Sequence, residues 1–206
     1  VPAMGCTEPI AIAYASALAR DTLGATPDRI EVQASGNLIK NVKSVVVPNT
    51  NGLKGIEAAV AAGVVAGNAG KALEVISEVS DEQKAQILAM VEKNICKVSL
   101  LDSGLVLDLI VTLYKGEDQA RVRIINSHTN VVLVEKNGTV LQEKPVDTTS
   151  SIGEISPEKQ LLTIHDIVEF ARTVNLDDVR EVLTRQINYN TAICEEGLRN
   201  NYGGNV

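Results

Sequence analysis

The 206-residue chain has no tryptophan and a single phenylalanine, and aromatic residues make up only 2% of it. Aromatic platforms on which nucleic acid bases stack are therefore missing. The sequence also lacks a cluster of lysine and arginine, and its formal net charge is -7 at pH 7. Both absences argue against binding to nucleic acid or to an anionic membrane surface. Alanine, valine, isoleucine and leucine must fill the core, and a hydrophobic content of 45% allows a sizeable one.

Cysteine is also scarce, with only Cys6, Cys96 and Cys194, far apart in the chain. Three thiols in a chain of this length do not form a disulfide framework, which favours a reducing, cytoplasmic location. No Cys-x-x-Cys or Cys/His spacing typical of zinc occurs, so the sequence predicts no metal ligands. We expect Cys96 to be structural and Cys194 to lie on the packed face of a helix.

Long hydrophobic runs are missing as well. The longest, residues 58–67, is too short to span a bilayer. No charged segment or cleavage signal precedes the first apolar stretch, so we expect no secretory signal peptide. The chain begins with valine and its last residues, 200–206, show no apolar pattern. We therefore expect a piece excised from a longer protein, forming one domain over residues 1–206.

Hydrophobic periodicity predicts an α+β fold, in which alanine-rich helices pack on an antiparallel-rich mixed sheet. Helices are predicted at residues 9–23 and 55–66 and after the capping residues Ser80, Thr163 and Asn175. The predicted strands are residues 29–35, 44–47, 97–101, 105–114, 120–125, 131–136 and 139–143. We expect the last five to form an antiparallel meander with helices on one face. Residues 36–43 and 145–159 are predicted to be irregular.

The first candidate site is the stretch 5–9, which has the sequence Gly-Cys-Thr-Glu-Pro. Proline favours the first position of a helix, so Glu8 is expected at or near the N-cap and Cys6 just before the helix. A helix N-terminus lowers the pKa of a nearby thiol, whereas an ionised Glu8 raises it, so the pattern leaves the net shift open. The alternative is a small buried thiol in a helix cap.

Two polar segments next to strands are further candidates. Residues 36–43 mix amide and amine side chains directly after a strand, where sites are commonly built. Residues 126–130, Asn-Ser-His-Thr-Asn, hold one of the two histidines, and their hydroxyls and amides place His128 for proton transfer or carboxylate recognition. The alternatives are a solvated turn for the first segment and a polar β-turn for the second.

The same segments carry a resemblance to a known family. The chain resembles the serine dehydratase alpha-chain-like proteins, and within them the L-cysteine desulfidase branch of UPF0597-type proteins. The order and approximate spacing of the matching motifs agree along almost the whole chain. They are Gly5-Cys6-Thr7-Glu8-Pro9, Asn37-Leu38-Ile39-Lys40-Asn41, Val47-Pro48, Gly67-Asn68-Ala69, Leu73-Glu74-Val75, His128-Thr129-Asn130 and Cys194-Glu195-Glu196-Gly197-Leu198.

The resemblance implies a lyase that converts L-cysteine to pyruvate, ammonia and sulfide, or L-serine to pyruvate and ammonia. The family uses a 4Fe–4S cluster in place of pyridoxal phosphate. An open iron site would act on the leaving group, while a protein base removes the α-proton and donors hold the carboxylate.

Carried over to this chain, the resemblance makes Cys6 and His128 the catalytic candidates. Cys6 would be a base or reactive thiolate, and His128 a proton carrier or carboxylate donor. The substrate-binding candidates are Thr7, Glu8, Asn37, Lys40, Asn41, Ser127, Thr129 and Asn130.

Members of the family are about twice as long as this chain, and their cluster cysteines lie mainly in a C-terminal half that is absent here. We therefore expect no cluster in the chain by itself and no activity, with half of the site supplied by the missing half; a homodimer is also possible. Two other functions stay open: an amino-acid-binding sensor module, and a thiol-dependent hydrolase that uses Cys6 and His128.

Overall fold

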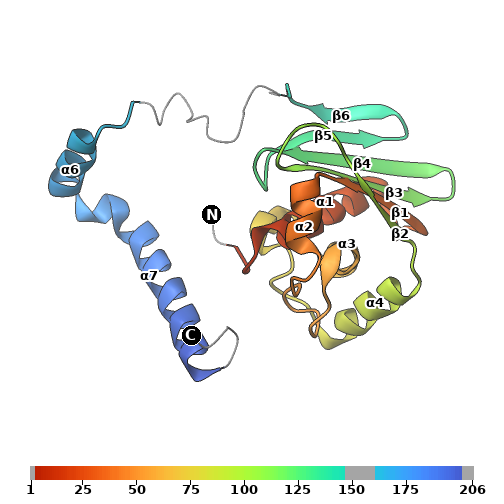
Figure 1. Ribbon diagram of the computed structural model, residues 1–206, viewed down its shortest axis with the longest axis horizontal. Coiled ribbons are helices and arrows are strands. Elements are labelled where there is room, and N and C mark those ends of the chain that lie inside the picture. Colours follow the sequence, from red (N-terminus) through yellow and green to blue (C-terminus); the bar gives the residue numbers. More distant parts are fainter. Residues whose placement is uncertain (1–2, 147–160, 201–206) are drawn as a thin grey trace. The chain divides into compact units, whose positions relative to one another are not determined.

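The computed structural model describes residues 3–146 and 161–200, which belong to two compact units. The first unit, Val1–Gly153, holds the sheet and the N-terminal helices, and the second, Glu154–Val206, holds two helices (Figure 1). The predicted connection at residues 145–159 lies almost entirely outside the described residues. Within the described ranges, no helix has the length and apolar content needed to cross a membrane.

A six-stranded mixed sheet frames the first unit, with the strand order β2-β1-β3-β4-β5-β6 (Figure 1). The strands are β1 (Arg29–Ala34), β2 (Cys96–Leu100), β3 (Asp108–Lys115), β4 (Asp118–Ile125), β5 (Val131–Lys136) and β6 (Thr139–Glu143). Only the β1–β2 pair is parallel, so the antiparallel-rich α+β fold is confirmed. The predicted meander is wrong at its first strand, because β2 pairs with β1 across a long helical connection instead of forming a hairpin with β3.

The helices of the first unit pack on one face of this sheet (Figure 1). They are α1 (Thr7–Leu23), α2 (Gly36–Val42), α3 (Gly55–Ala66), the 3₁₀ helix η1 (Ala69–Glu74) and α4 (Asp81–Glu92). Helix α1 contacts β3, β4 and β5 as well as α3 and η1, which explains why its sequence is apolar nearly all round. Its small side chains let these neighbours approach closely.

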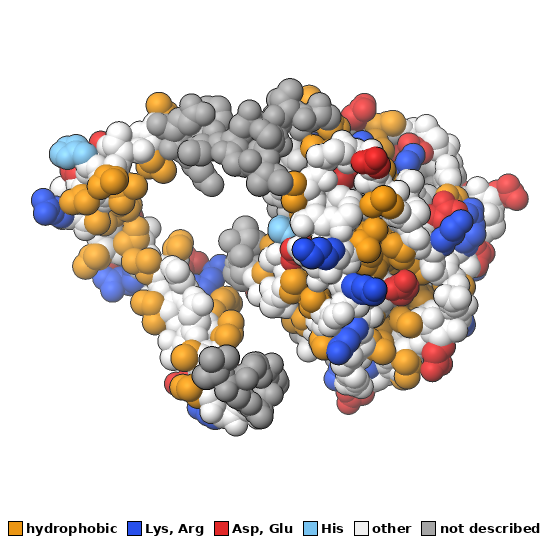
Figure 2. Space-filling model, viewed as in Figure 1, with side chains coloured by type: hydrophobic (Ala, Val, Ile, Leu, Met, Phe, Trp, Pro, Cys, Tyr) orange, Lys and Arg blue, Asp and Glu red, His pale blue; other side chains and the backbone are white. Residues whose placement is uncertain are grey.

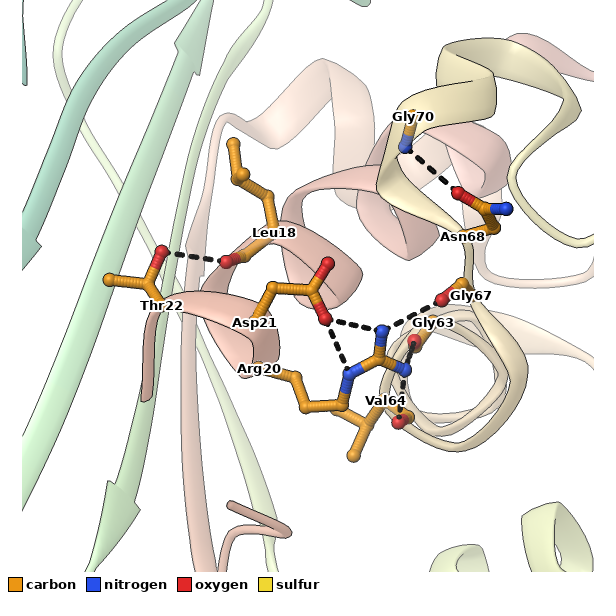
Figure 3. A network of polar contacts seen from close by, with 9 residues as sticks. All are labelled: Leu18, Arg20, Asp21, Thr22, Gly63, Val64, Gly67, Asn68 and Gly70. Atoms are coloured by element: carbon orange, nitrogen blue, oxygen red, sulfur yellow. Dashed lines mark hydrogen bonds and ion pairs between the residues drawn. The ribbon is translucent and has the colours of Figure 1, made fainter. Parts of the chain in front are cut away.

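Helices α1 and α3 are in direct backbone contact at Gly63. A Cβ atom there would lie 2.2 Å from the carbonyl oxygen of Ala13, so only glycine fits. At the end of α3, the Arg20 guanidinium donates to the carbonyl oxygens of Val64 and Gly67 at 2.9 and 2.8 Å (Figure 3). These carbonyls have no partner within their own helix, so Arg20 of α1 caps α3. The Gly-Asn-Ala motif that follows is therefore structural here.

Three local predictions are wrong. Helix α1 begins earlier than expected: Cys6 is its N-cap, and Glu8 and Pro9 lie in its first turn, where the missing proline N–H still costs nothing. The predicted loop 36–43 is mostly helix α2, since Leu38 and Val42, four residues apart, are both buried. The predicted strand 44–47 reduces to one isolated bridge.

Several turn and cap predictions are confirmed. Ser80 and Gln83 form a capping box at the start of α4, and Asn137 and Gly138 both have positive φ in the β5–β6 hairpin. In the second unit, Thr163 and Asn175 cap the helices α6 (Ile164–Thr173) and α7 (Leu176–Arg199). Cys194, expected on a packed face of the last helix, is exposed.

Candidate functional site

The predicted site segments meet at one end of the sheet. The register pairs Ala34, at the end of β1, with Leu109, and Asp108 with Ile125, the last residue of β4. The segment 126–130 leaves the sheet at this same end, and α2 begins there directly after β1. The N-terminus of α1 reaches α2 through a hydrogen bond between side chains, so the three sequence segments come together.

The Glu8 carboxylate is the centre of this cluster. Its Oε2 accepts hydrogen bonds from the Cys6 thiol at 3.0 Å and from the Thr7 hydroxyl at 3.4 Å. Its Oε1 accepts from the Asn41 amide nitrogen at 3.2 Å, across 33 residues of sequence. Both carboxylate oxygens are thus fixed by neighbouring donors, and the site is assembled around an acid rather than around the thiol.

These contacts set the charge of both groups. The Cys6 hydrogen bond, the Glu8 backbone N–H, Asn41 and the nearby His128 lower the pKa of the Glu8 carboxyl, although partial burial opposes them. Burial and the Glu8 carboxylate raise the pKa of the Cys6 thiol and outweigh the backbone N–H at the helix start, which lowers it. At neutral pH the pair therefore consists of an anionic Glu8 and a neutral Cys6.

His128 lies in a tight turn close to Glu8. Its side chain is half-buried, and its Nε2 atom is buried with no hydrogen-bond partner among the described residues. The turn is closed by backbone hydrogen bonds from Ser127 N–H to Ile125 O at 2.6 Å and from Asn130 N–H to Ser127 O at 3.0 Å. An imidazole nitrogen in this position can accept a proton or a hydrogen bond from a bound molecule.

The other predicted residues lie around this cluster without joining its hydrogen bonds. Asn37 and Lys40 are exposed on α2, and Ser127 and Thr129 are exposed on the turn. The side chain of Asn130 donates to the Ile125 carbonyl at 3.2 Å, which supports the turn. The structure thus brings together Cys6, Thr7, Glu8 and Asn41, with His128 close by.

An ion pair next to the turn was not predicted from the sequence. Asp108, whose side chain is fully buried, pairs with the Arg123 guanidinium at 2.7 and 3.0 Å. This contact raises the pKa of Arg123. The sequence does hold a signal, because Asp108 is the one acid of this strand and directly precedes the apolar run 109–111, and such a group needs a partner. The pair ties the start of β3 to the end of β4, where the His128 turn begins.

The cysteines do not form a ligand set for an iron–sulfur cluster. Cys96 is half-buried beside α3, and burial raises its pKa to about 12. Cys194 is exposed on α7. Over the described ranges, no group of three or more His, Cys, Asp or Glu side chains is placed to hold a metal ion. The residues present therefore do not fit such a cluster.

The Cys6 thiol also lacks the geometry of a histidine-activated nucleophile. Its hydrogen bond goes to Glu8, and no hydrogen bond joins it to His128 among the described contacts. A thiol-dependent hydrolase needs a base that takes the thiol proton and a lowered pKa, whereas the pKa of Cys6 is raised.

Comparison with known proteins finds similarity along the full chain. It is 47% identical over 206 residues to a UPF0597 protein of Desulfitobacterium hafniense, of which the match covers 47%. UPF0597 proteins of Lachnoclostridium phytofermentans and Treponema denticola are 44% and 42% identical over 206 and 203 residues, and 49% and 47% of their lengths are covered. The chain thus spans about half the length of the curated relatives it matches.

These matches support the predicted resemblance to UPF0597 proteins. No model of a known protein family matches the chain. No solved structure matches it either.

Proposed function

We propose that the cluster around Glu8 is part of the active site of a lyase that releases sulfide from L-cysteine, or water from L-serine, in the full-length protein. The observation that supports it most directly is the convergence of Cys6, Glu8 and Asn41 beside His128 at one end of the sheet. Three of the motifs that resemble the desulfidase branch supply the segments that meet there: Gly5–Pro9, Asn37–Asn41 and His128–Asn130. The similarity to UPF0597 proteins is consistent with this resemblance and names no activity.

In this proposal Glu8 binds the ammonium group of the substrate. Its lowered pKa makes it a poor proton acceptor but a stable anion, and an anion held by neutral donors suits an ammonium ligand. Asn41 and the Cys6 thiol keep the carboxylate in place. Lys40, exposed on the same short helix as Asn41, is the candidate donor for the substrate carboxylate.

His128 is the proposed proton carrier. Its buried Nε2 atom has no hydrogen-bond partner in the described part of the chain, so it can take the α-proton of a bound amino acid when the imidazole is neutral. Loss of that proton and of sulfide, which leaves with the electrons of the C–S bond, gives 2-aminoacrylate. Its imine form and water then give pyruvate and ammonia. The resemblance assigns activation of the leaving group to a 4Fe–4S cluster, and we place its ligands mainly in the part of the protein outside this chain.

The test is sulfide and pyruvate release by the anaerobically prepared full-length protein. We expect Glu8→Gln to raise the KM for L-cysteine at least tenfold, because an ammonium group loses its counter-charge. His128→Gln should lower kcat far more than it raises KM. The matched control is Glu31→Gln on β1, which should change neither constant. Wild-type protein that releases no product from L-cysteine or L-serine would refute the lyase proposal.

Calorimetry separates the lyase from a sensor module. If full-length protein binds L-cysteine, loses binding in the Glu8→Gln variant and yet forms no product, the cluster around Glu8 binds the amino acid and its function is sensing. The 206-residue chain alone should release no product and purify without stoichiometric iron. Stoichiometric iron and sulfide in it would contradict our placement of the cluster ligands.

A further inference from the structure

Helices α6 and α7 of the second unit each carry large apolar side chains that are exposed. Neither helix has a buried residue among those described. Hydrophobic side chains lie at the surface along both helices (Figure 2). Ile164 is 82% exposed and Ile187 is 63% exposed. A contiguous apolar surface of this kind marks an interaction site.

Five apolar residues of α7 recur at helical spacing and share one side of the helix. Leu176, Val179, Leu183, Ile187 and Cys194 recur at intervals of three, four, four and seven residues, so they line one stripe of the helix. Ala192, in contrast, lies on the opposite side. A helix of 24 residues with such a stripe is built to pack against a partner along its whole length.

The charge of the two helices argues against a membrane as that partner. Acidic side chains outnumber the arginines in residues 161–200, and the segment contains no lysine. Amphipathic helices that lie on anionic bilayers are instead rich in lysine and arginine on the polar face. The stripe is therefore suited to another protein surface.

We propose that this apolar face docks against the half of the full-length protein that lies outside this chain. The chain spans about half the length of its relatives, so in them a stretch of about the same length lies outside the matched part and can cover this face. Docking in one molecule needs no second binding partner and gives the face a high effective concentration of its target. The inference does not depend on the proposed activity, since it concerns packing alone.

The native thiol of Cys194 lies on the stripe. Its labelling rate therefore shows whether another part of the protein covers the stripe. In the isolated 206-residue chain we expect Cys194 to react with N-ethylmaleimide at the rate of a free exposed thiol. In the full-length protein the rate should fall at least tenfold, and the fall should not depend on protein concentration. A cysteine placed at Ala192 should react rapidly in both proteins. Peptide mass spectrometry resolves the individual sites.

A disruptive variant makes the test decisive. Leu183→Asp in the full-length protein should restore rapid labelling of Cys194, whereas Ala192→Asp on the opposite side should leave it slow. Rapid labelling of Cys194 in the wild-type full-length protein would overturn the proposal. So would protection that grows with concentration and accompanies a dimer mass in sedimentation, because the occupant would then be a second copy.

Discussion

At the scale of single residues, the Glu8 carboxylate controls the state of the Cys6 thiol. Burial and the negative charge of Glu8 both raise the thiol pKa. Removing the charge in Glu8→Gln should lower that pKa, so iodoacetamide should alkylate Cys6 roughly two- to tenfold faster at pH 7.5, since one pKa unit is tenfold in thiolate. The pH at which alkylation reaches half its maximal rate should also fall.

The other two cysteines serve as internal controls. In the 206-residue chain, the exposed Cys194 should react equally in the wild type and in Glu8→Gln. Cys96, with a pKa of about 12, should react slowly in both. An unchanged Cys6 profile would show that burial alone sets its pKa.

The same carboxylate should affect stability in acid. The pKa of Glu8 is lower in the folded chain than its ordinary value of about 4.3, so its ionised form favours folding. This contribution is present above about pH 4.3 and disappears as the pH falls through the folded value. Urea unfolding between pH 6 and pH 3 should therefore show a shallower loss of stability for Glu8→Gln than for the wild type. A steeper loss of stability in Glu8→Gln than in the wild type would contradict the lowered pKa of Glu8.

The buried Asp108–Arg123 pair should matter more for stability than any exposed ion pair. Asp108→Asn leaves the partly buried guanidinium without its counter-charge, and we expect it to lower the free energy of unfolding by roughly 2–4 kcal/mol. The matched control is Asp102→Asn in an exposed loop, which should stay within about 0.5 kcal/mol of the wild type. Urea denaturation measures the free energy of unfolding of both variants. Equal values for Asp108→Asn and Asp102→Asn would mean that the ion pair contributes nothing to stability.

At the scale of secondary structure elements, sequence patterns predict the features that interactions between residues close in sequence determine. The Ser80–Gln83 capping box and the positive φ of Asn137 and Gly138 follow from side-chain chemistry within a few residues, and the structure confirms them. Helix α2 was missed because its opening glycine and polar residues favour a loop, while its buried Leu38 and Val42 gain their energy from tertiary packing. The place of β1 between β2 and β3 depends on long-range pairing, which no local pattern contains.

The packing of α1 on α3 gives a sharp prediction at this scale. In an exposed helix, replacing glycine by alanine stabilises the helix by about 1 kcal/mol. At Gly63, however, the added Cβ would meet the backbone of Ala13 at 2.2–2.8 Å, so the helices must separate. We expect Gly63→Ala to lower the free energy of unfolding by roughly 1–3 kcal/mol, measured by urea denaturation.

Two further variants identify the cause of the destabilisation expected for Gly63→Ala. Ala13→Gly should not rescue Gly63→Ala, because the clash is with backbone atoms and not with the Ala13 side chain. Gly197→Ala in α7, where a Cβ would meet no atom within 4 Å, should leave the unfolding of the first unit unchanged. Rescue by Ala13→Gly would show that side-chain crowding, rather than backbone contact, limits the helix spacing.

At the scale of the whole molecule, the sequence allowed us to predict which segments form the candidate site. It did not allow us to predict the contacts between them. The motifs named Cys6, Glu8, Asn41 and His128, and the structure brings these residues to one end of the sheet. Their roles were less accessible, because the charge of Glu8 and Cys6 depends on contacts that form only after folding. Asp108 and Arg123 are fifteen residues apart, and only the register of β3 and β4 places them together.

The division into two units leads to the last prediction. Among residues 3–146 and 161–200, the buried residues of the hydrophobic core all lie in the first unit, between Ile10 and Val134, and none lies in α6 or α7. A chain shortened after Gly153 should therefore keep its core, unfold cooperatively and melt within about 2 °C of the 206-residue chain, as followed by the circular dichroism of the sheet. Because Cys6 and Glu8 belong to this unit, the alkylation profile of Cys6 should also be unchanged. A drop of more than about 5 °C would mean that α6 and α7 contribute contacts to the first unit, since each kcal/mol shifts the melting temperature of a domain of this size by about 2–4 °C.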